Sequence, residues 1–402
     1  MAYELKKSDL EALLLGGAFF GCGGGGTLKS ARNLAARFEK GDYYPTGTVR
    51  VVTVEEATVD ADGDAVMVAY LGAPEPINKA HYPIGPVEAV RNIQTQLATR
   101  GRRLAYIAPP ECGALGFVVA CLVAAKLGLA VIDADGAGRA VPSLPMLTFA
   151  ASNIDPRPAI LVSQSGLSVE LNVTPLEGVP RNASQDVSAI LERMMRPVVS
   201  EENFGQFGGL AMWVMTPSQL PGAMPIRGTL SRSIELGRAL ENGEIKTPEQ
   251  VIRFAADRFG IAMHAIAGPG EFVAASLNTA GGFDVGTVRI RTEGEEFTVL
   301  YKNESLIVWN SKTTGPVMLA PDSVTYFVEG GEDAIATNGD LIAEDGLLNR
   351  SVRGRKVTLL AWEAEPQLTV EGGIILESFM SLLASLGYHG AYVPVGALRR
   401  SK

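Results

Sequence analysis

The sequence predicts an α/β protein of two domains, a mostly parallel, layered α/β domain followed by a β-rich domain of the α+β type. The chain has 402 residues, which is more than one hydrophobic core usually serves. In its first third, short apolar strands alternate with helical segments, the pattern of a parallel sheet covered on both faces. From Gly286 to Trp362 nearly every segment is strand-like, and Gly, Asn and Asp mark the turns, which is typical of antiparallel sheets.

The composition fits a folded protein whose partners are not polyanions. Hydrophobic residues make up 47% of the chain and charged residues 20%, which supports large cores and argues against disorder. The formal net charge of -9 disfavours nucleic acid and anionic membranes as partners, because both attract basic patches. The low charge also suggests that another copy of the chain covers some apolar surface, and we therefore expect a homo-oligomer.

Cysteine usage and the first residues favour a cytoplasmic location. Three cysteines are too few for a disulfide scaffold and suit a reducing compartment. The segment Met1–Leu10 carries several charges and cannot be the apolar core of a signal peptide. The longest apolar stretch, Leu115–Ile132, is interrupted by Lys126 and by glycines. It predicts a buried helix followed by a buried strand, not a membrane span.

The first domain is predicted to begin with two helices around a glycine run. The first helix is expected over Ser8–Leu15 and ends at the pair Gly16-Gly17, and the second is expected to begin at Thr27. Strands and helices then alternate at Val49–Val54, Ala65–Leu71, Pro86–Thr99, Leu104–Ile107, Leu115–Lys126 and Ala130–Asp133. Right-handed crossovers would bring the carboxyl ends of these strands to one edge, where such sheets bind ligands.

A domain boundary is predicted near residue 155. The segment Asn153–Pro158 has two prolines and no periodicity. We therefore assign residues 1–155 to the α/β domain and residues 156–402 to the β-rich domain. The final segment, residues 375–402, is a candidate to pack back on the first domain.

The sharpest local feature is the run Gly21-Cys22-Gly23-Gly24-Gly25-Gly26. Successive glycines let the backbone approach a ligand closely and adopt positive φ. Ahead of a helix, their N–H groups form an anion site. No Lys-Ser/Thr pair follows, and no strand precedes the run, so it is neither a Walker loop nor a dinucleotide fingerprint. The alternative is a close-packed turn between two helices.

A second candidate is the segment that follows the strand at Ala130, with Asp133, Asp135, Gly136 and Arg139. Residues two apart on a strand face the same side, so both carboxylates could act on one ligand or on a divalent metal. Arg139 could pair with an aspartate or hold a substrate carboxylate. The alternative is a solvated turn in which the aspartates bind local N–H groups.

The third candidate is Glu111-Cys112-Gly113, which follows two prolines. Near a helix amino terminus, Cys112 is expected to have a lowered pKa and to be a candidate nucleophile, as is Cys22 in the glycine run. Glu111 could act as a general acid or base. A small buried cysteine is the alternative. The three histidines are far apart, and no HxxxH or CxxC spacing supports a metal site.

Together these segments resemble the S-methyl-thiohydantoin desulfurase-like family, over nearly the whole chain. The glycine run, the Pro110-Glu111-Cys112-Gly113 turn and the Asp-rich segment carry the resemblance. Further matching segments are Ile226-Arg227-Gly228-Thr229, Glu235-Leu236-Gly237-Arg238, Asn303-Glu304, Pro321-Asp322, Gly387-Tyr388 and Tyr392-Val393-Pro394, whereas Lys29 and His389 depart from the pattern. The resemblance implies an α/β domain, a β-rich domain and a link to the hydantoinase/oxoprolinase system, whose substrates are small cyclic amides or thioamides.

The resulting hypothesis is a hydrolase or desulfurase. Asp133 or Asp135 would activate water, directly or through a metal, and Glu111 would protonate the leaving group. Amides of the glycine run would stabilise developing charge, and a covalent route through Cys112 is a variant. The substitution Asp135→Asn is expected to abolish turnover with little loss of stability. Two alternatives are a non-catalytic subunit that binds a hydantoinase/oxoprolinase-like partner and a phosphate- or nucleotide-binding protein that uses the glycine run.

Overall fold

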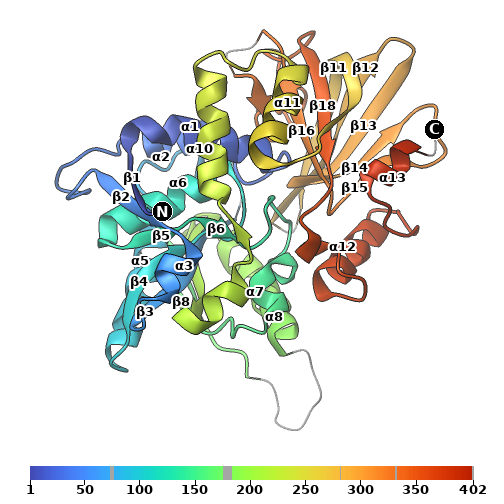
Figure 1. The fold of residues 1–402 in the computed structure, drawn as a ribbon. Helices are drawn as coiled ribbons and strands as arrows, with labels where there is room; N and C mark the ends of the chain where they lie inside the picture. Colours follow the sequence, from blue (N-terminus) through green and yellow to red (C-terminus); the bar gives the residue numbers. More distant parts are fainter. Residues whose placement is uncertain (73–76, 175–182, 281, 331–332, 401–402) are drawn as a thin grey trace.

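Two eight-stranded β-sheets with their helices make up the structure, a computed structural model (Figure 1). It describes residues 1–72, 77–174, 183–280, 282–330 and 333–400. In Figure 1 the first sheet and its helices lie at the lower left, and the second sheet lies at the upper right.

The first sheet is parallel at its centre and antiparallel at its edges. In sheet order its strands are β1 (Tyr3–Lys6), β2 (Thr48–Val52), β5 (Ala130–Ile132), β4 (Arg103–Ala108), β3 (Gly63–Gly72), β9 (Phe207–Met215), β7 (Ala159–Ser163) and β8 (Ser168–Leu171). The pairs β2–β5, β5–β4 and β4–β3 are parallel, and the other neighbours are antiparallel. The predicted layered α/β sheet is confirmed.

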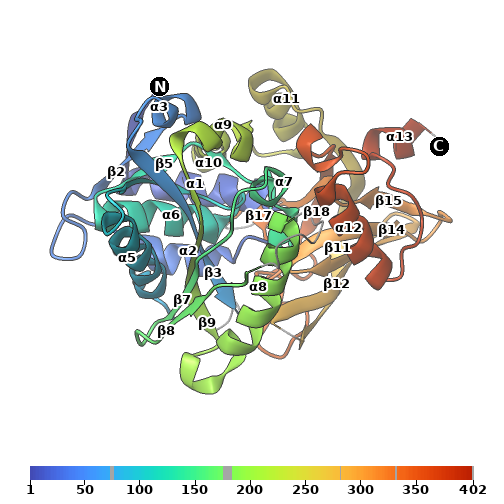
Figure 2. The same ribbon diagram turned by 90° about the horizontal axis from the view of Figure 1, so that it is seen from below.

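Helices cover both faces of this sheet, because alternate residues of β3 enter two different cores. One core includes Val66 and Val68, and the other includes Ala65 and Met67. On the first face lie α1 (Lys7–Phe20), α2 (Leu28–Ala35), α5 (Ile84–Ala98) and α6 (Ala114–Leu127); on the second lie α7 (Thr148–Ala151) and α8 (Ala183–Ser200). Figure 2 shows α5 and α6 on one side of the sheet and α8 on the other.

The first helix is longer than predicted. It continues through Gly16 and Gly17 and ends at Phe20, because both glycines allow close packing. A Cβ at Gly16 would lie 1.9 Å from the carbonyl oxygen of Ser233 in α10 (Thr229–Glu241), and one at Gly17 would lie 2.8 Å from that of Gly113. The glycines therefore serve helix packing rather than a helix end.

The second sheet is antiparallel throughout, as predicted. In sheet order its strands are β15 (Pro316–Leu319), β14 (Glu304–Asn310), β13 (Glu295–Lys302), β12 (Phe283–Thr292), β11 (His264–Ala280), β18 (Lys356–Trp362), β16 (Ser323–Val328) and β17 (Ile335–Ala336). The long strand β11 was not predicted, because Gly268-Pro269-Gly270 has the composition of a turn. The strand passes through this segment with shifts of register against β18.

The first sheet continues beyond residue 155. Strands β7, β8 and β9 all belong to it, and a short ribbon pairs β6 (Ala134–Asp135) with β10 (Ile226–Arg227). The division of the chain at residue 155 stays a prediction, but it does not coincide with the end of the sheet. In the last segment, α12 (Ile374–Ser385) packs on α7 and on the short helix Leu144–Met146 of the first domain.

The remaining helices are short or peripheral, and they are α3 (Val54–Thr58), α9 (Leu220–Ala223), α11 (Pro248–Phe259) and α13 (Val395–Arg400). In the part of the chain that the structure describes, no helix has both the length and the apolar character needed to cross a membrane.

Candidate active site

The glycine loop, residues 21–26, lies between the two sheets and is shaped by close contacts on both sides. Gly23, Gly25 and Gly26 have φ of +79°, +69° and +85°, a region that favours glycine. A Cβ at Gly25 would lie 2.5 Å from the Cα of Gly113, and one at Gly24 would lie 2.4 Å from the Cγ of Glu304. The backbone of the loop thus approaches both neighbours more closely than any other residue type would allow.

Backbone hydrogen bonds tie the loop to both sheets. The amide of Leu115 in α6 donates to the carbonyl of Gly25 at 3.0 Å. From the second sheet, the amide of Ser305 donates to Cys22 at 2.9 Å, and that of Asn338 donates to Gly23 at 2.7 Å. The loop is therefore part of the interface between the domains.

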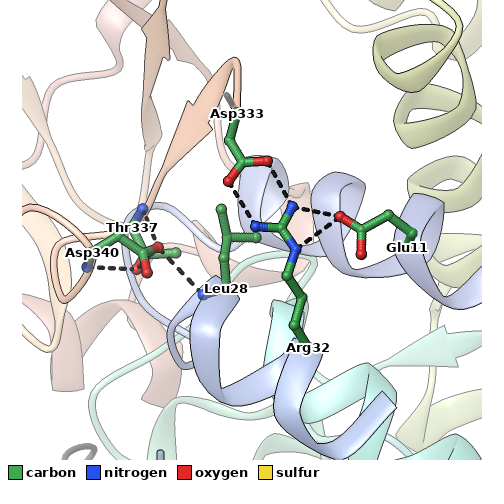
Figure 3. A network of polar contacts seen from close by, with 6 residues as sticks. All are labelled: Glu11, Leu28, Arg32, Asp333, Thr337 and Asp340. Atoms are coloured by element: carbon green, nitrogen blue, oxygen red, sulfur yellow. Dashed lines mark hydrogen bonds and ion pairs between the residues drawn. The ribbon is translucent and has the colours of Figure 1, made fainter. Parts of the chain in front are cut away.

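The start of α2 is occupied by a carboxylate of the chain itself. The predicted start of this helix at Thr27 is confirmed, since Thr27 caps α2 and its hydroxyl accepts from the amide of Ser30 at 3.0 Å. The amide of Leu28 donates to Asp340 at 3.3 Å, and Asp340 also accepts from the hydroxyl of Thr337 at 2.6 Å (Figure 3). A phosphate at this helix start would have to displace Asp340.

A second set of polar contacts near the start of α2 joins this helix to α1 and to the second domain. Arg32 on α2 donates to Glu11 on α1 and, through two nitrogens at 2.8 and 2.6 Å, to Asp333 of the second sheet's β16–β17 connection (Figure 3). These half-exposed ion pairs hold α2 against the second domain.

A cavity of about 150 Å³ lies beside the loop, and both domains line it. It is smaller than the roughly 300–1,000 Å³ of pockets for drug-sized ligands, so it suits one small ring. Its polar lining includes the glycine loop, Glu111, Asp284, Asn303, Glu304, Asn338 and the hydroxyl side chains of Thr27, Ser30, Tyr70, Tyr301 and Thr337, and its apolar lining includes Ala69, Ile77, Leu115 and Val119.

Two carboxyl groups, Glu111 and Glu304, meet at this cavity from opposite domains. Glu111 follows the end of β4, and its Oε2 accepts from the amide of Val141 at 2.7 Å. Glu304 is the first residue of β14 and is 3% exposed, and its Oε2 has no hydrogen-bond partner among the described residues. An unpaired buried oxygen costs free energy and needs a ligand or water as partner.

The surroundings raise the pKa of both carboxyls. Burial raises the pKa of Glu111 well above its ordinary value, and the charge of Glu304 raises it further. Burial likewise raises the pKa of Glu304 to about 7, although Arg139 and the amide of Gly25 oppose the shift. Two neighbouring carboxyls titrate as a pair. The pair therefore keeps a proton to a higher pH than an isolated, exposed carboxyl does.

The two aspartates of the Asp-rich segment do not line the cavity. Strand β5 ends at Ile132, and the next residues pair with β10, so the expected common face is lost. Asp133 caps α10, where its Oδ1 accepts from the amides of Leu230 and Ser231. Asp135 is buried and accepts from the amides of Ala137 and Gly138 at 2.7 and 2.6 Å. Asp135 thus binds local N–H groups, as the alternative predicted, but it is buried and not solvated. Asp133 instead binds amides of α10, which is distant in sequence.

The two candidate nucleophilic cysteines are buried as well. The Sγ of Cys112 donates to Asp135 at 3.1 Å, and that of Cys22 donates to the carbonyl of Phe20 at 3.4 Å. Burial, with the carboxylate of Asp135, raises the pKa of Cys112 well above its ordinary value. The prediction that the helix start lowers this pKa is wrong, because desolvation of the thiolate outweighs the helix dipole.

Arg139 and Gly136 hold the segment in place. All the hydrogen bonds of the Arg139 side chain go to carbonyl oxygens: its own neighbour Ala140, and Ser305, Pro321 and Asp322 of the second domain, at 2.5–3.0 Å. Arg139 therefore does not pair with an aspartate. The amide of Gly136 donates to Pro110 at 2.8 Å, which fixes the turn that carries Glu111.

Of the residues predicted for the site, the structure brings Glu111 and Gly23–Gly26 to the cavity. Glu304 was not predicted as a site residue, although the pair Asn303-Glu304 contributed to the family resemblance. No local pattern marks it, since a single Glu at a strand start is common. The described residues contain no group of three or more His, Cys, Asp and Glu side chains suited to a metal, and a divalent metal stays a prediction.

Comparison with known proteins covers both halves of the chain. The family model of the S-Me-THD-like N-terminal domain matches residues 8–173, and that of the S-Me-THD-like C-terminal domain matches residues 185–395. No curated protein matches the chain. A crystal structure of a protein from Chromobacterium violaceum, a structural genomics target, is 53% identical in sequence with a TM-score of 0.89. The match covers 98% of this chain and 100% of that chain.

Proposed function

Because the chain belongs to the S-Me-THD-like family, we propose that it hydrolyses a small cyclic thioamide or amide of the S-methyl-thiohydantoin type. The observation that carries the proposal is the pair of buried carboxyls, Glu111 and Glu304, that line one small cavity from opposite domains. Burial raises the pKa of both, and carboxyls with raised pKa values are suited to act as general acid and general base near neutral pH.

In the addition step, the Glu304 carboxylate takes a proton from water as the water oxygen bonds to the ring carbon that bears sulfur. Glu111 gives its proton to the imine nitrogen of the ring, and the electron pair of the C=N bond moves to that nitrogen as the water adds. The product of this step is a neutral tetrahedral adduct, with Glu304 protonated and Glu111 ionised.

In the elimination step, the carbon–sulfur bond breaks and Glu304 returns its proton to the departing sulfur, so methanethiol leaves. Glu111 takes the hydroxyl proton of the adduct as the carbonyl of the hydantoin forms. Both carboxyls are then in their starting states, and the net reaction consumes one water. General acid or general base catalysis by each carboxyl is worth roughly 10²–10⁴-fold in rate.

The test is the release of thiol from S-methyl-thiohydantoin, read with a colorimetric thiol reagent while hydantoin is quantified by chromatography. The variants Glu304→Gln and Glu111→Gln are expected to lose turnover by roughly 10²-fold or more. Glu293→Gln, in the exposed β12–β13 turn, is the matched control and should keep the wild-type rate. If both cavity variants fold and keep the rate within tenfold, the carboxyl pair is not the machinery. If the wild type releases no thiol, this substrate is excluded.

A further inference from the structure

The lining of the cavity is acidic, and this bears on the charge of its ligand. Three carboxyl groups line it, from Glu111, Glu304 and Asp284, and none of the described residues that line it is Lys, Arg or His. Asp284 lies in β12, where its Oδ1 accepts from the hydroxyl of Thr279 at 2.7 Å. Burial raises its pKa too. A ligand that enters this cavity meets carboxyl oxygens and no cationic side chain.

Arg139 and Arg196, whose positive charges act on Glu304, donate their side-chain hydrogen bonds to other groups. The Arg139 side chain donates to backbone carbonyls. Arg196 donates to Glu192 at 3.1 and 2.6 Å and to the carbonyl of Gly282 at 2.8 Å. The positive charges of both arginines lower the pKa of Glu304, and the pKa of about 7 includes their effect. Neither lines the cavity.

Lys302, which follows the cavity residue Tyr301 in sequence, lines a different cavity. The ammonium of Lys302 lies 3.9 Å from the ring centroid of Phe283. Its side chain lines a separate cavity of about 340 Å³, together with Glu377 and Ser381 of α12. The acidic cavity is thus left without a cation of its own among the described residues, and a buried carboxylate without a partner is costly.

We propose that this cavity binds its ring ligand as an N-protonated amidinium cation, the class that includes cyclic amidines, cyclic guanidines and S-alkyl isothioureas. The proposal rests on the proposed function and deepens it. The N–C(SCH₃)=N unit of S-methyl-thiohydantoin is an isothiourea. A carboxylate accepts an N–H group of such a cation in a charge-assisted hydrogen bond, which is stronger than one to a neutral N–H group.

Protonation of this unit also serves the chemistry. The positive charge is shared over nitrogen, carbon and nitrogen, so the carbon becomes a better acceptor for the attacking water. The proton of Glu111 supplies this charge, and the ligand's N–H supplies the partner that the buried Oε2 of Glu304 lacks. In the hydantoin product a carbonyl replaces the C–SCH₃ group and the formerly basic ring nitrogen is an amide N–H. The product therefore cannot form the cation and is expected to bind more weakly and leave.

The proposal is tested by measuring how tightly the protein binds two small ring compounds, one cationic and one neutral. This measurement does not depend on turnover of a thiohydantoin. The cationic probe is 2-methyl-2-imidazoline, a cyclic amidine that is protonated at neutral pH and has no leaving group, and the neutral probe is 2-imidazolidinone, which has a five-membered ring of the same size. Isothermal titration at pH 8 should give the cation at least tenfold tighter binding. The preference should shrink at pH 6, where Glu304 is mostly protonated, and should be lost in Glu304→Gln but kept in Glu293→Gln.

Equal binding of the two probes at pH 8, or a preference that survives in Glu304→Gln, overturns the proposal. Asp284→Asn is a second variant, expected to reduce the preference severalfold without removing it. The outcome is separable from that of the thiol assay. Cation preference without thiol release upholds this proposal while the proposed function fails; thiol release without cation preference does the reverse.

Discussion

Replacing Glu304 by glutamine is expected to make the protein more stable in neutral and alkaline solution while it removes activity. Glutamine has nearly the shape of a protonated carboxyl and carries no charge at any pH. The wild-type side chain, in contrast, is 3% exposed and must be buried with a negative charge once it ionises. The substitution therefore isolates the cost of that charge.

The magnitude follows from the pKa of Glu304. Burial raises this pKa to about 7 from an ordinary value of 4.5. A carboxyl with a raised pKa binds its proton more tightly in the folded than in the unfolded state. Its contribution to stability is therefore fully present below about pH 4.5 and is lost as the pH rises to about 7. The difference between the two values corresponds to about 3 kcal/mol at pH 8. At pH 5 it amounts to less than about 1 kcal/mol.

The assay is urea unfolding of wild type, Glu304→Gln and Glu293→Gln at pH 5 and pH 8, followed by tryptophan fluorescence. The tryptophans report on both sheets, with Trp213 in β9 and Trp362 in β18. We expect Glu304→Gln to match the wild type within about 1 kcal/mol at pH 5 and to exceed it by about 3 kcal/mol at pH 8. A variant less stable than the wild type at pH 8, or a difference that does not change with pH, would refute the reasoning.

Three further substitutions test the surroundings of the pair. Gly24→Ala places a Cβ 2.4 Å from the Glu304 side chain and should lower turnover at least tenfold in the thiol assay, whereas Gly41→Ala, with open space around it, should not. Asp135→Asn keeps an acceptor for the two buried amides and should retain turnover within tenfold, but Asp135→Ala should lose about 2 kcal/mol in urea unfolding. An inactive, well-folded Asp135→Asn protein would restore the earlier catalytic assignment. Arg32→Met should cost about 1 kcal/mol at low salt and less at 1 M salt, as measured by thermal unfolding.

Much of the architecture follows from local patterns in the sequence. The central strands and α6 are predicted almost to the residue, because apolar β-branched runs and a long apolar helix have few alternatives inside a layered core. The extent of α1 is not predictable in this way. Gly16 and Gly17 usually end a helix, and only the approach of α10 explains why they lie inside one.

Only part of the site can be predicted from the sequence, because some of its features depend on contacts between distant segments of the chain. Glu111 stands out because it follows a strand end and precedes a helix, both of which are local features. The alternation rule failed for Asp133 and Asp135, because it assumes one continuous strand, whereas the backbone changes partner from β2 to β10 between them. Glu304 acquires its raised pKa only through burial against the glycine loop, and no window of sequence contains that contact.

The position of the carboxyl pair explains why the two domains are so closely joined. Glu111 comes from the first sheet and Glu304 from the second, and the glycine loop between them hydrogen-bonds to α6 on one side and to Ser305 on the other. Neither domain alone contains both carboxyls or encloses the cavity. The free-energy cost of burying Glu304 therefore arises at the interface between the domains. The hydrogen bonds that Arg139 donates to carbonyl oxygens of the second domain offset this cost. A buried, underpaired acid that the fold does not need for stability is a mark of a functional site, and here it lies against the glycine loop, which hydrogen-bonds to both domains.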